Sequence, residues 1–134
     1  MKTIFKIFLQ IIFFLILVSC GNHNGGSKRQ DYLSREVSYY ATPSSDAFGY
    51  AIKLDRSNQS YCLYENSFRN KEWRVKTSGQ YSERIENNVA ICDLHIEPEL
   101  LGDVYEIRVY INADKAAFIS ISSQIDAAPC APIQ

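Results

Sequence analysis

Histidine is scarce in this chain of 134 residues, which contains only His23 and His95. A protein zinc site usually takes three or four ligands, so isolated histidines with scattered carboxylates do not mark one. The sequence also lacks a glycine-rich phosphate-binding loop and a Gly-x-Ser-x-Gly nucleophile motif. Asp93 and His95 would share one face of a strand, but catalysis there would need a serine on that face and a pocket. We therefore expect no catalytic residue, no metal and no cofactor.

An excess of charge of either sign is missing as well, because 14 basic and 15 acidic residues give a net charge of −1. Nucleic-acid binding calls for a basic face, so we expect no nucleic-acid partner. Charge is instead segregated locally. Between Glu83 and Glu106, seven residues are acidic and Arg84 is the only basic one. These are Glu83, Glu86, Asp93, Glu97, Glu99, Asp103 and Glu106. They predict an acidic surface for a basic partner protein, or else solvated charge on neighbouring strands.

No hydrophobic run is long enough to span a bilayer, which takes about 17–25 mostly apolar residues. Residues 7–18 form an apolar stretch of 12 residues that only Gln10 interrupts. Lys2 and Lys6 precede this stretch, and Leu17-Val18-Ser19-Cys20 ends it. A charged start, a short apolar core and a small residue before the cut are typical of a secretory signal peptide. Residues 1–19 are therefore predicted to be cleaved; an uncleaved anchor and a buried helix are the alternatives.

The residues around Cys20 also predict a covalent modification of the exported protein. Leu17-Val18-Ser19-Cys20 resembles the lipobox of bacterial lipoproteins, in which the cysteine is lipidated and becomes the mature N-terminus. The resemblance implies that Cys20 carries three acyl chains and holds the protein on a membrane of the bacterial cell envelope. A single acyl chain binds only marginally, so several chains are needed for stable attachment. Gly21 stands where inner-membrane lipoproteins often have Asp, which favours the outer membrane, facing the periplasm.

Cleavage would leave 115 residues, enough for one domain with a small core. Residues 22–30 contain no apolar side chain, so residues 20–30 are predicted to be a flexible, lipidated tether to a single domain over 31–134. Residues 48–54 alternate between large apolar and small or polar side chains, as do residues 104–111. Short strands separated by turns, one of them at Ser78-Gly79, predict an all-β fold: a small antiparallel sandwich or barrel of about seven strands. Residues 32–40 fit either a strand or a short helix.

Three cysteines remain for the domain when Cys20 carries the lipid: Cys62, Cys92 and Cys130. Export permits a disulfide, and three cysteines allow three single pairings. We favour Cys62–Cys92, because both residues lie in predicted strands, and Cys130 could instead tie the C-terminal tail to either one. Such a bridge would contribute about 2–4 kcal/mol to the free energy of unfolding.

One short segment resembles a known inhibitor family. Thr77-Ser78-Gly79-Gln80-Tyr81 is similar to the Ser-Gly-x-x-Tyr loop of membrane-bound C-type lysozyme inhibitors, with one residue instead of two between Gly79 and Tyr81. Together with the predicted address, this suggests a non-catalytic, protein-binding lipoprotein of the inhibitor or toxin-immunity type. A structural or assembly role in the envelope is the alternative. The candidate partner-binding residues lie in or beside the acidic stretch: Tyr81, Glu97, Glu99 and Tyr105.

Overall fold

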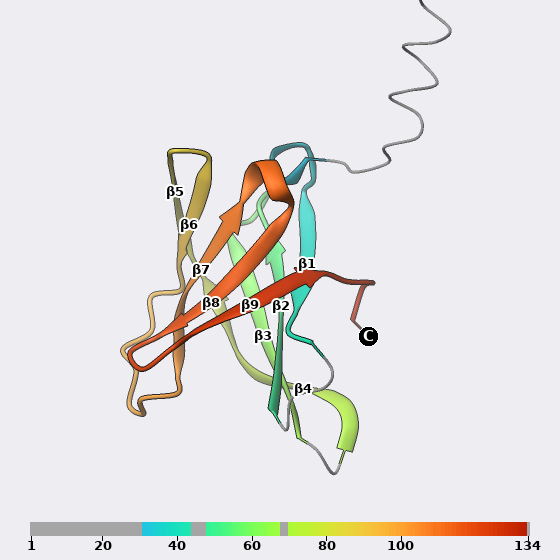
Figure 1. The fold of residues 1–134 in the computed structure, drawn as a ribbon, viewed down its shortest axis with the longest axis vertical. Helices are drawn as coiled ribbons and strands as arrows, with labels where there is room; N and C mark the ends of the chain where they lie inside the picture. Colours follow the sequence, from blue (N-terminus) through green and yellow to red (C-terminus); the bar gives the residue numbers. More distant parts are fainter. Residues whose placement is uncertain (1–30, 44–47, 68–69, 134) are drawn as a thin grey trace, which may run out of the picture. The chain divides into compact units, whose positions relative to one another are not determined.

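The computed structural model describes residues 31–43, 48–67 and 70–133, and the predicted signal peptide and tether lie outside these ranges. Nine strands and two short 3-10 turns follow one another along the described chain (Figure 1). They are η1 (Tyr32–Ser34), β1 (Val37–Ala41), β2 (Phe48–Asp55), β3 (Ser60–Ser67), β4 (Asn70–Gln80), β5 (Ser82–Glu86), β6 (Val89–Asp93), β7 (Val104–Tyr110), η2 (Ile111–Ala113), β8 (Lys115–Ser120) and β9 (Gln124–Pro129).

All nine strands belong to one antiparallel sheet in the order β4-β3-β2-β1-β9-β8-β7-β6-β5. β4 and β5 are its opposite edges, yet only Tyr81 separates them in the chain. The sheet therefore curls into a half-barrel whose two edges meet at Tyr81 (Figure 1). The predicted all-β class is confirmed, and one curled sheet matches the barrel alternative better than two stacked sheets. The strand count is nine, not about seven.

The two additional strands, β5 and β9, show little hydrophobic alternation. β5 reads Ser-Glu-Arg-Ile-Glu, and β9 buries only Ala127 fully. Residues 32–40 divide between the two structures predicted for them, η1 first and β1 after it. The predicted turn at Ser78-Gly79 is wrong, because β4 continues to Gln80. Gly79 lies against the ring of Tyr61: a Cβ there would be 3.4 Å from Cε1 of Tyr61, an ordinary van der Waals contact.

The core lies on the concave face of the sheet. Tyr40, Ile52 and Leu63 are register neighbours on β1, β2 and β3, and all three are buried. Ile107 pairs with Phe118 across β7 and β8 and is equally buried. Each large apolar side chain removed from water in this way stabilises the fold by roughly 1.5–3 kcal/mol. The alternation predicted for β2 and β7 therefore marks the faces that build the core.

Two β-bulges bend the sheet near the loop that follows β6. Lys76 is the extra residue where β4 pairs with β3, and Tyr105 is the extra residue where β7 pairs with β8. A bulge redirects side chains and increases the local twist. Lys76 forms ion pairs with Glu65 at 3.5 Å and with Asp103 at 3.6 Å. The second pair links β4 to the β6–β7 loop, residues 94–103.

Candidate functional site

The β6–β7 loop and the β8–β9 turn present a group of exposed aliphatic side chains. Leu100 and Leu101 in the loop are 71% and 65% exposed, and Ile121 in the turn is 59% exposed. The Ser122 hydroxyl donates a 2.8 Å hydrogen bond to the carbonyl of Leu101, which joins the two connections. Figure 1 shows them side by side at one end of the sheet. We call Leu100, Leu101 and Ile121 the loop patch.

Hydrogen bonds hold the loop patch in a defined shape. The Asp103 carboxylate accepts backbone N–H groups from Glu99 at 3.2 Å and Leu100 at 3.0 Å. These bonds, the one from Leu100 foremost, and the nearby Lys76 lower the pKa of Asp103 below its ordinary value of 3.8. In the β8–β9 turn, Ser120 Oγ accepts the backbone N–H of Ser123 at 3.1 Å. Both connections are therefore fixed by their own polar groups, and their aliphatic side chains remain exposed.

Ion pairs compensate most of the negative charge of the acidic stretch. Four of the seven carboxylates have basic partners: Glu83 with Arg56, Glu86 with Arg84, Asp103 with Lys76, and Glu106 with Arg108. Glu97 and Glu99 are exposed on the β6–β7 loop and have no ion pair with any residue that the structure describes. The negative charge open to a partner therefore concentrates beside the loop patch.

The two predicted tyrosines have different surroundings. Tyr105 is half-buried in the β7 bulge, and its carbonyl accepts the N–H of Leu94 at 3.0 Å, which fixes the start of the β6–β7 loop. Tyr81 is only 2% exposed, and its backbone N–H binds the carbonyl of Gln59 at 2.9 Å. Tyr81 therefore cannot join Glu97 and Glu99 in an exposed contact surface in this structure. The sequence missed this because it does not show that the two edges of the sheet meet there.

A partly buried polar network attaches η1 to the sheet. The Tyr32 hydroxyl donates a 2.6 Å hydrogen bond to Glu83, and Arg56 binds the same carboxylate through Nε at 3.2 Å and Nη2 at 2.9 Å. Arg56 also donates to the carbonyl of Leu33, and its guanidinium lies 5.0 Å from the centre of the Tyr32 ring. Burial raises the pKa of Tyr32 far above its ordinary value, so the phenol stays protonated.

The three cysteines of the described chain are free thiols, so the disulfide favoured from the sequence is not present in this structure. Cys92 is buried, and burial raises its pKa to about 12. Cys62 lies between the buried residues Tyr61 and Leu63, so it occupies the opposite, outer face of β3. The backbone N–H of Cys130 binds the carbonyl of Tyr39, which places β1 and β2 between Cys130 and Cys62. Three strand spacings of about 4.8 Å exceed the roughly 7 Å that a bridge allows between Cα atoms.

His95 has the serine neighbour that the sequence alone did not reveal. Ser82 is the register partner of Asp93, and its Oγ lies 2.7 Å from Nε2 of His95. The Asp93 carboxylate lies 4.0 Å from Nδ1 of His95 and instead accepts the backbone N–H of His95 at 2.9 Å. A distance of 4.0 Å is too long for the hydrogen bond that orients a catalytic imidazole. The three side chains therefore form an exposed surface cluster without the geometry of a nucleophilic triad.

Comparisons with known proteins add no relatives. A scan against protein-family models finds no match, and searches of curated proteins and of solved structures find none either. Within the described ranges, no group of three or more potential metal-ligating side chains comes together. No helix in that part of the chain has the length and apolarity that membrane crossing requires. Cys20 and His23 lie outside the described residues.

Proposed function

We propose that this chain is a lipid-anchored, non-catalytic protein-binding module of the inhibitor or toxin-immunity type. The observation that carries the proposal is the loop patch, where three exposed aliphatic side chains lie on two hydrogen-bonded connections. Exposed apolar groups that cluster, unlike scattered ones, are typical of protein-interaction surfaces. Glu97 and Glu99 border the patch and carry uncompensated charge, which favours a partner with an apolar contact surface ringed by Lys or Arg.

The experiment begins with capture of the partner by the full chain in living bacteria. A photo-crosslinking residue at Leu101 is compared with the same residue at Val75, which is similarly exposed, at 62%, but lies on β4. We expect a discrete adduct from position 101 and none from position 75. The identity of the adduct separates a delivered toxin or enzyme from a resident envelope protein, which would favour the assembly role.

The affinity of the captured partner is then measured with the full chain in detergent. We expect Leu101→Ser to weaken binding about tenfold, as truncation of a central contact residue costs roughly 1–2 kcal/mol. Glu97→Lys together with Glu99→Lys should slow association and reverse its salt dependence. Equal affinities for Leu101→Ser, Val75→Ser and the unaltered chain would remove the loop patch as the contact surface.

A further inference from the structure

The β5 edge of the sheet has no second neighbouring strand among the residues that the structure describes. β5 pairs with β6 alone, and Figure 1 shows it at the outer edge of the sheet. The end of the β5–β6 hairpin is held in place, because the carbonyl of Asn88 accepts the backbone N–H of Ile111 at 3.0 Å. An unpaired edge presents a row of backbone N–H and C=O groups to which a further strand can bind. β5 is therefore a preformed site for strand addition.

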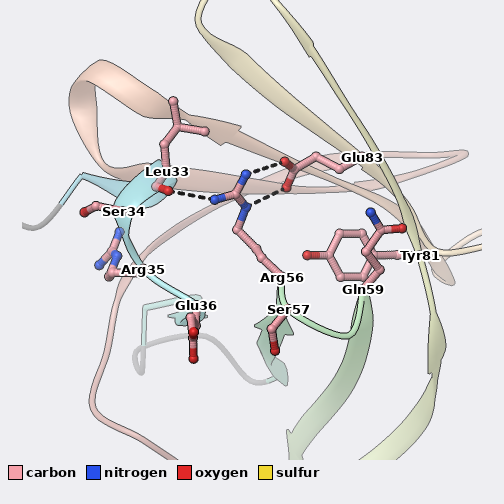
Figure 2. Close-up of a pocket in the computed structure, with 9 residues that line it drawn as sticks. All are labelled: Leu33, Ser34, Arg35, Glu36, Arg56, Ser57, Gln59, Tyr81 and Glu83. Atoms are coloured by element: carbon pink, nitrogen blue, oxygen red, sulfur yellow. Dashed lines mark hydrogen bonds and ion pairs between the residues drawn. The ribbon is translucent and has the colours of Figure 1, made fainter.

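The two free edges of the sheet differ in how well they are protected. β4 is interrupted by the bulge at Lys76, and its sequence also contains Lys71 and Arg74. Bulges and basic side chains discourage the addition of a strand. β5 pairs with β6 without a register shift and contains neither proline nor lysine. Its inward charge, Glu83, is compensated, because both carboxylate oxygens bind Arg56 (Figure 2). Of the two edges, β5 is the one open to another chain.

The β5–β6 turn determines which backbone groups of β5 face the open edge. Its two asparagines have φ of 50° and 62°, as a type I′ turn requires, and the turn joins Glu86 to its register partner Val89. The residues that flank such a turn exchange hydrogen bonds, and bonded pairs alternate along an antiparallel ladder. Glu86 and Arg84 therefore bond to β6, whereas the N–H and C=O of Ile85 point to the open edge. The side chain of Ile85 is 50% exposed.

The charges of β5 select one register for two copies of this strand. Arg84 and Glu86 lie on one face, where both are exposed and form an ion pair at 3.1 Å. A register centred on Arg84 or on Glu83 would place like charges opposite each other, which is unfavourable. A register centred on Ile85 instead places Arg84 of each copy opposite Glu86 of the other. These are positions between hydrogen-bonded pairs, where opposing side chains are closest.

We propose that two copies of this chain associate through β5, antiparallel and centred on Ile85, so that their sheets join. A two-fold axis brings the same residues of both copies together, and the order Arg84, Ile85, Glu86 is complementary to itself under that axis. The two Ile85 residues would exchange backbone hydrogen bonds and cover each other's exposed side chains. One short strand pair buries little surface, and small interfaces are transient. We therefore expect a concentration-dependent equilibrium between monomer and dimer.

Sedimentation equilibrium of the full chain in excess, density-matched detergent measures the dissociation constant of the dimer. Arg84→Glu and Glu86→Arg each place like charges opposite each other and should weaken the dimer about tenfold, because each dimer contains two such contacts. The variant with both substitutions restores opposite charges in reversed order and should recover the affinity. Asp126→Arg, at an exposed position on the interior strand β9, makes the same change in charge as Glu86→Arg and should leave the dissociation constant unchanged.

Hydrogen exchange locates the contact independently of the variants. The backbone N–H of Ile85 should exchange more slowly as the concentration of the unaltered chain rises. Thermal melting checks that the variants fold, which we expect because Arg84 and Glu86 are exposed. A chain that stays monomeric, exchange at Ile85 that does not depend on concentration, or a double variant as weak as the single ones would overturn the proposal. A dimer weakened by Val75→Ser or Leu101→Ser and not by the β5 variants would also overturn it. The β5 dimer does not depend on the loop patch and is tested separately from it.

Discussion

Two ion pairs on β5 show how the surroundings of a residue decide what its charge contributes. Glu83 points to the concave side of the sheet, where Arg56 and Tyr32 both bind it. Glu86 carries the same group three residues later, but it and its partner Arg84 are exposed. Exposed pairs contribute little because water and salt screen them, whereas breaking a buried pair leaves a charge without solvation. Glu83 is therefore a structural residue, and the sequence alone does not distinguish it from Glu86.

Glu83→Gln tests this difference while keeping the shape of the side chain and one acceptor oxygen. We expect the free energy of unfolding to fall by about 2 kcal/mol, less than for a fully buried pair because Arg56 retains partial contact with water. Glu86→Gln is the matched control and should change stability by less than about 0.5 kcal/mol. Urea denaturation of both variants measures the two effects. Equal losses would mean that burial of the Glu83 network contributes nothing.

At the scale of elements, the Trp73 ring of β4 packs against Gly49 of β2. A Cβ on Gly49 would lie 3.3 Å from Cη2 of Trp73 and 3.4 Å from Oγ1 of Thr42. The first distance is tighter than ordinary van der Waals contact and the second is at its lower limit, so the Trp73 ring would have to shift to admit a larger residue on β2. Thr42 Oγ1 also accepts the backbone N–H of Tyr50 at 2.9 Å and cannot move without losing that bond. Close packing, and not an unusual backbone angle, therefore favours glycine at position 49.

Gly49→Val should therefore destabilise the fold by about 1–3 kcal/mol through overpacking. Trp73 is the only tryptophan of the chain, so its fluorescence should shift as the ring is displaced. Gly102→Val is the control, because no atom lies within 4 Å of a Cβ there, and it should change stability by less than about 0.5 kcal/mol. Unaltered fluorescence and stability in Gly49→Val would contradict the packing argument.

For the whole molecule, the sequence predicts those strands whose burial is periodic. Ile52 and Leu54 on β2 and Ile107 and Val109 on β7 are buried as their alternation indicates. The sequence does not predict β5, because β5 is an edge strand and the partly buried side chain on its inner face, Glu83, is charged. Edge strands can be polar on both faces, so their sequences need not show the two-residue alternation of apolar and polar side chains.

Some features of the candidate site depend on local sequence, and others depend on contacts between distant segments. Exposed Glu97 and Glu99 follow from their loop position beside Pro98, which sequence reasoning identifies. The loop patch and the burial of Tyr81 depend on contacts between distant segments, such as Ser122 with Leu101. Arg56 and Glu83 are 27 residues apart and meet only because the sheet curls. Long-range closure of this kind has no signature in local residue order.

The attachment of the whole molecule to its membrane is predicted from residues 7–20 and can be tested directly. Growth with an alkyne-labelled fatty acid should tag the unaltered chain, and mass spectrometry should show an acylated N-terminus at Cys20 without residues 1–19. Each buried methylene of the added chains contributes about 0.8 kcal/mol to membrane binding, so several acyl chains together hold the protein on the membrane. Cys20→Ser should abolish the label, whereas Cys62→Ser should retain it. An unlabelled chain that keeps residues 1–19 would instead identify an uncleaved anchor, and it would return Cys20 to the set of thiols available for pairing.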